Sequence, residues 1–599
     1  MRLRRKIRYR RWRSHVAVSL LVVMALGGGG CFVDHPVEQY YGRAVAPRTQ
    51  EFRWSDGGLP QVFDPALAAV PPDTDAVRAI YEGLTEYDPR TLAPVPGVAA
   101  RWESSADNRE WTFYLRRDAR WSNNDAVTAH DFVRSWQRII ELGDRAPHAR
   151  LLRNIQGAQP VELQPTPTPA PKPEAQAQVP NEPGVTEEAK KETKPEEAPP
   201  QPKFGVEAVD DYTLRVRLQR PDPGFPSLVA HPVFRPVHKA DEAAALQGQS
   251  AAPSRVVSNG AFQLSKIGDD GVVLERANNY WDAQTVTLQR VQFVPAKDAE
   301  SVLASYRAGD VDAVTNAGFE PLALKLLTPY KDFRRATFGA LTYYSFNTAR
   351  APFDDVRIRE ALSITIDRDR ISQDELGGAT EPAKKFLPTQ MTSATDASHA
   401  PAPMIERNVE RARKLLAEAG FPDGKNFPKI RLLINRNAQQ RQVAEAVAAM
   451  WRSTLKIETE IIAKDWSEYE SAFRAGEYDI ARRSYVMQTM DETSCLREML
   501  EPELTPVAAA ELQTGAQPEV NGDPGDVRKA IEKQIGEVLP APMKVYTEAQ
   551  AIKELPAMPI YFASSYALVK PYVSGFDANL LDAPSLKSVR IDTSWQQSK

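Results

Sequence analysis

A proline-rich stretch in the first third of the chain limits what the rest of the chain can fold into. Residues 160–203 contain 12 of the 48 prolines, together with eight glutamates, five lysines and no aromatic residue. Such a segment cannot bury enough apolar surface to offset the entropy lost on ordering, so we expect a disordered or polyproline-like insert. The following residues 206–218 have the pattern of a β-hairpin with its turn at Asp210 and Asp211, so the insert interrupts a folded domain. A proline-rich ligand for a partner protein is the alternative.

The N-terminus has the pattern of a bacterial export signal. Eight arginines and lysines precede an apolar run over 16–26, and no acidic residue occurs before Asp34. A run of eleven residues is too short to span a bilayer, which needs about 20. Four glycines then precede Cys31, which resembles the acylated cysteine of bacterial lipoproteins, although Gly28 stands where that motif prefers leucine. We predict a signal peptide over 1–30 and a lipid on Cys31; an ordinary secretory signal is the alternative.

The cysteine, histidine and charge content excludes several classes of protein. With lipid on Cys31, Cys495 is the only cysteine left, so neither a disulfide nor a cysteine-rich zinc or iron–sulfur site can form. The seven histidines are scattered without a pair at metal-ligand spacing, and no catalytic serine motif or phosphate-binding loop occurs. We therefore predict no metal, no cofactor and no enzymatic activity. A net charge of −4 argues against a nucleic-acid-binding protein.

Short strand patterns alternate with amphipathic helix patterns along the rest of the chain. Asn408 is placed to cap one of the helices, and Gly420 is placed to end it. The alternation indicates an α/β fold with at least two lobes. The expected strands lie over 111–115, 272–275 and 457–462, and the expected helices over 129–140, 408–419 and 440–455.

A series of longer motifs follows in a fixed order along the chain. Some have a structural explanation: Gly260 would relieve a φ restriction in a turn, and Asp354 and Asp355 would cap a helix. The aromatic residues of the longest motif are expected in a core rather than against a ligand. The motifs cover residues 61–65, 80–84, 96–138, 258–262, 279–281, 306–312, 352–357, 367–368 and 570–571.

Together these motifs closely resemble those of the family 5 extracellular solute-binding proteins, the oligopeptide and dipeptide receptors of ABC importers. The resemblance implies an α/β, two-lobed periplasmic-binding-protein-like fold of type II and cluster C, with an extra subdomain in the first lobe. The implied boundaries are 1–30 for the signal peptide, 31–49 for a lipidated tether, 50–84 and 232–340 for lobe 1, 85–231 for the extra subdomain around the insert, 341–556 for lobe 2, and 557–599 for the return to lobe 1.

The resemblance also implies a function. The protein would capture peptides or peptide-like solutes by hinge closure and deliver them to an ABC permease, acting as a monomer anchored by lipid in the bacterial cell envelope. The alternative is an envelope lipoprotein that uses the same scaffold for sensing or for a structural role, without transport.

At the ligand cleft, the resemblance implies roles for individual residues. Arg482 aligns with a conserved arginine of the family; the alternative role for Arg482 is an ion pair within its own lobe. Tyr485 aligns with a position in the aromatic wall of the cleft. Gln488 falls where the family has an aspartate that binds the peptide's ammonium group. Since glutamine supplies no charge, either Asp491 or Glu492 takes over, or the ligand is not a free-amine peptide. The other candidate ligand residues are Val70, His148, Asn316, Tyr343, Tyr344 and Trp466.

Overall fold

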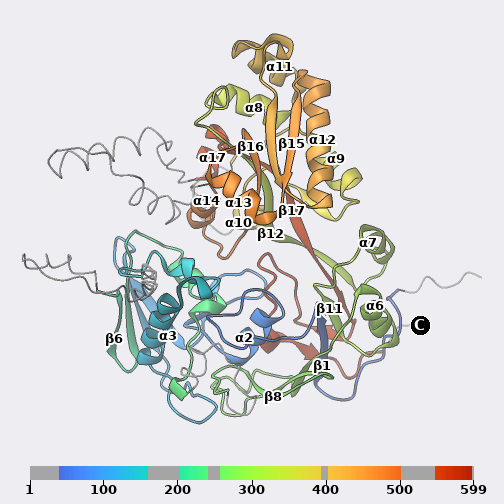
Figure 1. The fold of residues 1–599 in the computed structure, drawn as a ribbon. Helices are drawn as coiled ribbons and strands as arrows, with labels where there is room; N and C mark the ends of the chain where they lie inside the picture. Colours follow the sequence, from blue (N-terminus) through green and yellow to red (C-terminus); the bar gives the residue numbers. More distant parts are fainter. Residues whose placement is uncertain (1–38, 159–202, 241–255, 393–401, 501–546, 597–599) are drawn as a thin grey trace, which may run out of the picture.

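The protein folds into two lobes that share one twisted β-sheet (Figure 1). The computed structural model describes residues 39–158, 203–240, 256–392, 402–500 and 547–596. The two-lobed α/β architecture predicted above is confirmed; the predicted signal peptide, Cys31 and nearly all of the proline-rich insert lie outside the described residues. The sheet order is β15 (Thr459–Lys464), β14 (Ile430–Asn435), β16 (Ile480–Val486), β12 (Phe333–Phe346), β17 (Ala557–Val569), β11 (Ala313–Thr315), β1 (Glu51–Asp56), β10 (Arg290–Phe293), β9 (Gly271–Arg276) and β8 (Phe262–Gly268), with β13 (Thr380–Pro382) paired to β17.

The first lobe is built on the end of the sheet that contains β1. β1 runs parallel to both β10 and β11, and its alternate residues Phe52 and Trp54 are buried against Phe293 and Phe576. Residues 39–43, part of the expected tether, lie against helix α6, where Tyr41 stacks on Tyr306. The other elements are α2 (Asp73–Ile80), α6 (Ala299–Ala308), α7 (Pro321–Leu327), β18 (Val573–Ser574) and β19 (Arg590–Ile591).

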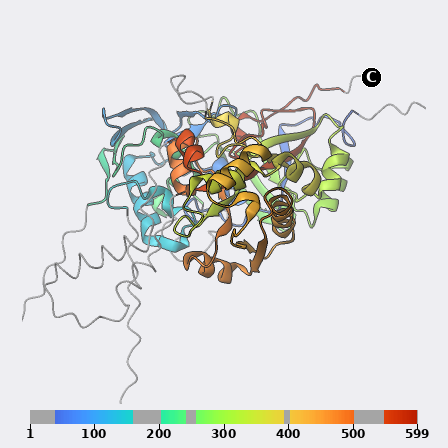
Figure 2. The ribbon, with the colours of Figure 1, turned by 90° about the horizontal axis from the view of Figure 1, so that it is seen from above.

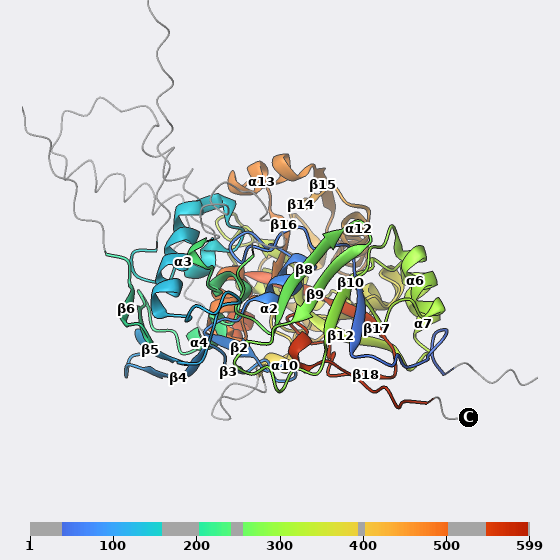
Figure 3. The same cartoon turned by 90° about the horizontal axis from the view of Figure 1, so that it is seen from below.

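An extra subdomain with its own sheet lies at one side of the first lobe (Figure 3). Its sheet is antiparallel in the order β4-β5-β7-β6, and β6 and β7 form the hairpin predicted from residues 206–218. Helix α3 packs on this sheet through an apolar stripe that includes Phe132, Trp136 and Ile139, all buried as the helical period predicts. The elements are β2 (Thr85–Tyr87), β3 (Pro94–Pro96), β4 (Ala99–Ser104), β5 (Glu110–Leu115), α3 (Ala129–Leu142), β6 (Val206–Asp210), β7 (Thr213–Arg217) and α4 (Phe225–Leu228).

The second lobe lies over the middle of the first (Figure 2). Helices cover both faces of its strands: Leu432 on β14 packs in a core with α8, α11 and α12, whereas Leu433 packs against α13. The side chain of Asn408 caps α11 by accepting a hydrogen bond from the Arg411 amide, as predicted. The helices are α8 (Val356–Ile364), α9 (Arg368–Arg370), α10 (Thr389–Thr392), α11 (Val409–Glu418), α12 (Ala438–Leu455), α13 (Trp466–Arg474), α14 (Glu492–Leu500) and α17 (Glu548–Glu554).

Two long strands, β12 and β17, carry the chain between the lobes. In the first lobe Leu568 of β17 pairs with β11, and in the second lobe residues 340–346 of β12 pair with β16. The pairing of β12 with β17 shifts register between Thr337 and Leu341, so the sheet is irregular where it crosses. The crossing lies within β17 rather than at residue 557, where the return was expected, because Met558 is still buried in the second-lobe core.

Glycine at position 260 is needed for a reason other than the one predicted. The φ angle of Gly260 is not in the left-handed region, so relief of a φ restriction is not its role. Its amide donates to the Ile80 carbonyl at 2.8 Å, and a Cβ on Gly260 would lie 2.6 Å from the Ile80 carbonyl carbon. The motif over 258–262 therefore serves close approach of the backbone to the end of α2.

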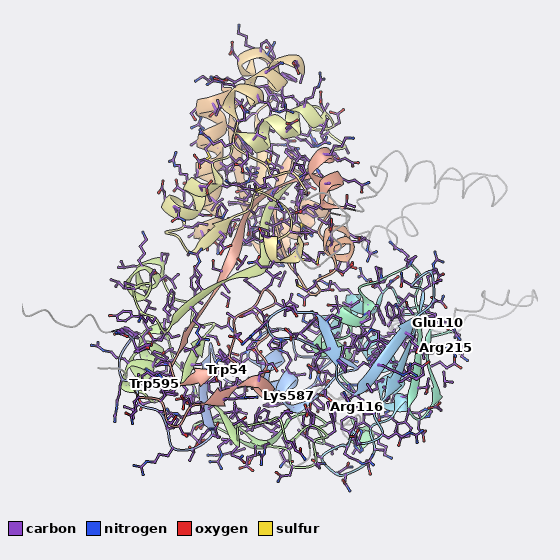
Figure 4. All side chains as sticks on the ribbon, turned by 180° about the vertical axis from the view of Figure 1, so that it is seen from behind. Trp54, Glu110, Arg116, Arg215, Lys587 and Trp595 are labelled. Atoms are coloured by element: carbon purple, nitrogen blue, oxygen red, sulfur yellow. The ribbon has the colours of Figure 1, made fainter. Side chains whose placement is uncertain are left out.

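Three of the sequence motifs meet at a buried carboxylate, Glu82, in the first lobe. Glu82 accepts hydrogen bonds from the Tyr280 hydroxyl and from the Trp281 indole N–H (2.7 Å). Lys587 donates to the Tyr280 hydroxyl at 3.1 Å, and the Arg116 guanidinium lies 3.6 Å from the Trp281 ring centroid; both side chains are labelled in the first lobe in Figure 4. Burial, reinforced by the charge of nearby Glu86, raises the pKa of Glu82 to about 7.

Candidate ligand-binding cleft

The parallel strands of the second lobe end at an edge that faces the first lobe. β14, β15 and β16 end at Asn435, Lys464 and Val486, and α12 and α13 begin shortly after the first two. Gln488, two residues beyond β16, contacts His231 of the first lobe, which places this edge between the lobes. Because ligands of open α/β sheets bind at the carboxyl ends of the strands, this edge forms the second lobe's side of the candidate cleft.

In the first lobe, parallel strands β1 and β11 end at a buried carboxyl group, Asp56. The Thr315 hydroxyl and the Asn316 side-chain amide donate to one Asp56 oxygen at 2.6 and 2.7 Å. Burial and the neighbouring carboxylate of Asp75 raise the pKa of Asp56 well above its ordinary value. The other Asp56 oxygen is buried and has no hydrogen-bond partner among the described residues. The predicted ligand residue Asn316 is therefore engaged in fixing the end of β1.

Two histidines of the first lobe lie beside Gln488. The rings of His148 and His231 are packed edge to face with their centroids 4.7 Å apart. His148 Nε2 lies 2.9 Å from the Ala69 carbonyl oxygen, next to Val70, which is 62% exposed. His231 Nε2 lies 2.9 Å from Gln488 Oε1. The structure thus brings two predicted ligand residues, His148 and Gln488, into contact with His231, and His148 also contacts the main chain next to Val70.

Asp491 and Glu492, the two acidic residues that could supply the charge missing at Gln488, both make structural contacts. Asp491 accepts a hydrogen bond from the Ser494 amide at 2.7 Å, at the start of α14, and a Cβ on Gly224 would lie 2.7 Å from Asp491 Cβ. Glu492 accepts from the Glu548 amide at 2.6 Å. Asp491 therefore lies against the first-lobe subdomain, where burial of Asp222 and the charge of Asp491 raise the pKa of Asp222 to about 6.

Arg482 lies half-buried on β16 without an ion-pair partner among the residues that the structure describes. Its Nη1 lies 3.4 Å from Asn435 Oδ1, and its buried Nε has no hydrogen-bond acceptor there. The nearby carboxylate of Asp479 pairs instead with Arg431 (2.9 Å) and Arg350 (3.5 Å). With the residues described here, Arg482 therefore does not form the ion pair within its lobe that was the alternative prediction. Its guanidinium group can receive an anion.

The three predicted tyrosines are buried in the second lobe. The Tyr343 hydroxyl donates to the Met499 carbonyl at 2.8 Å, and the Tyr485 hydroxyl donates to Glu498 at 3.1 Å. Tyr485 was expected on an aromatic wall, but it packs in a core with Tyr343, because the two side chains lie on the same face of paired strands. Tyr344, one position along β12, lies on the opposite face and is fully buried.

Trp466 is the exposed aromatic residue at the cleft edge. It occupies the first position of α13 and is 61% exposed. Its ring stacks on Tyr469 with centroids 5.5 Å apart, and the stack continues through Phe473 to Tyr478 at 6.3 and 5.1 Å. The stack supports one face of the Trp466 ring and leaves the ring largely exposed to solvent, which suits contact with a ligand.

Sequence reasoning missed His231, Asp56 and Asp75. None of them lies in a motif that signals chemistry, and each becomes notable only through a partner far away in the chain. The contact between His231 and Gln488, for example, joins positions 257 residues apart. No local pattern carries that information.

The comparison with protein families gives a match over most of the chain. Residues 93–503 match the family of bacterial extracellular solute-binding proteins, family 5. The periplasmic oligopeptide-binding protein OppA of Haemophilus influenzae is 30% identical over 534 residues, which cover 87% of this chain and 90% of that protein.

Solved structures agree with this match. The unliganded open form of the periplasmic murein tripeptide-binding protein MppA has a TM-score of 0.68 and 27% identity, covering 92% of this chain and 98% of that one. Haemophilus influenzae OppA in complex with the peptide RPPGFSPFR has a TM-score of 0.56 and 27% identity, covering 91% and 99%. The chain therefore belongs to family 5 of the bacterial extracellular solute-binding proteins, and it is a binding protein rather than an enzyme.

Proposed function

We propose that this protein captures peptides or peptide-like solutes between its lobes and delivers them to the permease of an ABC importer. The observation that carries the proposal is the edge of the second lobe, where Arg482 has no ion-pair partner among the described residues and Gln488 reaches the first lobe. The peptide in the Haemophilus influenzae OppA complex, a 27% identical relative, supports a peptide as the ligand.

Capture would follow from contacts made to both lobes at once. A solute that touched only one lobe would leave the equilibrium between open and closed forms unchanged, whereas one that bridges them stabilises the closed form. Arg482 and Trp466 would act from the second lobe, and Val70 and His148 from the first. β12 and β17 would bend at their irregular crossing. The TM-score of 0.68 to an unliganded open form supports an open starting state.

Peptide binding with closure is the direct test. Titration of the purified protein with a pool of tri- to hexapeptides is expected to give saturable heat by calorimetry, and the radius of gyration from small-angle X-ray scattering should fall because the lobes approach. Free amino acids are the control, since they are too short to bridge the lobes. No binding by any peptide, or binding without a change in the radius of gyration, contradicts capture by closure.

The protein would be held at the cell envelope as a monomer by a lipid on Cys31. Among the described residues no helix combines the length and apolar composition that crossing a membrane requires. Cys31→Ser is expected to move the protein from the detergent-extracted membrane fraction to the soluble fraction, because the acylation site is lost. Fractionation and mass spectrometry of the N-terminus check this; Cys495→Ser, which alters the other cysteine, should leave the protein with the membrane. A soluble wild-type protein would refute the anchor.

A further inference from the structure

The amide group of Gln488 is engaged with the first lobe. His231 Nδ1 accepts a hydrogen bond from the Val233 amide at 3.2 Å, so the proton of the neutral ring is on Nε2. His231 Nε2 therefore donates to Gln488 Oε1, 2.9 Å away, and Gln488 Nε2 donates to the Val486 carbonyl at 3.1 Å. The Tyr87 hydroxyl donates to the main-chain carbonyl of Gln488 at 3.3 Å. Gln488 thus links the lobes through neutral hydrogen bonds.

The surroundings of His231 disfavour a positive charge. His231 is buried, and its burial, together with the nearby His148, Arg78 and Arg235, lowers the pKa of its ring well below the ordinary value. An ammonium group brought to Gln488 would enter the same surroundings. It would lose its water and would meet a neutral amide whose oxygen already accepts one hydrogen bond.

The nearby carboxylates are engaged elsewhere. Asp75 pairs with Arg78 at 2.6 Å, and Glu86 pairs with Arg235 at 2.5 Å. Beyond Gln488 along the chain, Asp491 and Glu492 accept hydrogen bonds from main-chain amides. Asp75 and Glu86 are therefore already paired with arginines, and the hydrogen bonds of Asp491 and Glu492 orient these two side chains toward main-chain amides of α14 and α17.

We propose that this cleft takes peptide-like solutes whose amino end carries no charge, such as N-acylated or side-chain-linked peptides, and that Gln488 positions the lobes through His231. The inference rests on the proposed function and specifies its substrate class. A blocked amino end presents an amide instead of an ammonium group, so it places no unpaired charge beside His231 and can still accept or donate hydrogen bonds.

Matched peptide pairs test the proposal. Each pair has one sequence, a free carboxyl end, and either a free or an N-acetylated amino end; binding to the full, signal-processed protein is measured by calorimetry. Because each 1.4 kcal/mol corresponds to a factor of ten, a buried unpaired ammonium group should weaken binding at least tenfold. We expect the acetylated member to bind at least tenfold more tightly. Free-amine peptides that bind as tightly as their acetylated partners overturn the proposal and leave peptide capture standing, whereas no binding by either member overturns the proposed function itself.

Gln488→Asp is the variant that should change the preference. The new carboxylate supplies a counter-ion at the position where the described wild-type cleft presents a neutral amide, so free-amine peptides should gain at least tenfold in affinity relative to the wild type. Gln442→Asp is the matched control: it adds the same charge on α12, where Gln442 is exposed and contacts the Glu375 carbonyl. Circular dichroism verifies folding of both variants, and the wild-type pairs decide the question if Gln488→Asp does not fold. A folded Gln488→Asp protein with unchanged preference contradicts the proposal.

Discussion

Replacement of Arg482 by alanine is expected to weaken binding of a peptide with a free carboxyl end by about 100-fold. The guanidinium group is half-buried at the cleft edge and has no acidic partner within the described part of the chain, so a ligand carboxylate would complete its charge. Removal of one partner of a partly buried, charge-assisted pair costs about 3 kcal/mol, which is slightly more than two factors of ten in Kd. Calorimetry of Arg482→Ala and wild type with one peptide measures the ratio.

Arg483→Ala provides a neighbouring control for this experiment. Arg483 is the next residue on β16, but its side chain lies on the other face, with its guanidinium 4.3 Å from the Phe473 ring centroid. Its loss should change peptide affinity by less than about threefold, because it is held within the lobe. Amidation of the peptide's carboxyl end should abolish the difference between wild type and Arg482→Ala. An undiminished effect on the amidated peptide would contradict a carboxylate contact.

Local structure could be predicted from the sequence where one physical signal dominates. The period of apolar residues located helix α3, and its stripe is buried as expected. The cap at Asn408 and the hairpin of β6 and β7 were found for the same reason, since capping side chains and turn residues act over three or four positions. The turn itself lies at Asp211 and Tyr212, one residue later than predicted, because Asp210 still pairs with Thr213.

Long-range features could not be predicted in this way. The thirteen residues of β17 belong to one continuous strand that pairs with β12 along most of its length, and only its other partner changes, from β13 in the second lobe to β11 in the first. No change of pattern marks the expected boundary at 557. The candidate site could not be predicted fully for the same reason. Alignment with the family shows which family position Gln488 occupies, but it does not reveal that Gln488 contacts His231.

The motifs that revealed the family contribute chiefly to the first-lobe scaffold. Motifs 80–84, 258–262 and 279–281 converge on Glu82, whose carbonyl accepts from the Asn259 side chain at 3.0 Å. By contrast, Arg482 and Gln488 lie on and just after one strand of the second lobe. Resemblance in the scaffold motifs therefore identifies the fold, and the few residues at the cleft edge decide which solute binds.

Glu82 should make the free energy of unfolding depend on pH. The pKa of its carboxyl group is about 7 in the folded protein, against about 4.5 in an unfolded chain. The folded state therefore binds more protons between these values, so this group stabilises the protein at low pH and its contribution is lost as pH rises through 7. Glu82→Gln keeps the shape of the protonated form and removes the titration.

Between pH 5 and pH 8, the free energy of unfolding of Glu82→Gln should rise relative to wild type by about 2 to 3 kcal/mol, measured by urea denaturation at each pH. The Tyr280 hydroxyl can accept from the new amide while the Trp281 N–H still donates to its oxygen, so the hydrogen bonds are kept. Glu103→Gln, at a side chain 60% exposed in the same lobe, should stay within about 0.5 kcal/mol of wild type throughout. Equal pH dependence of wild type and Glu82→Gln would mean that this carboxylate remains ionised in the fold, held by Lys587 and the two aromatic donors.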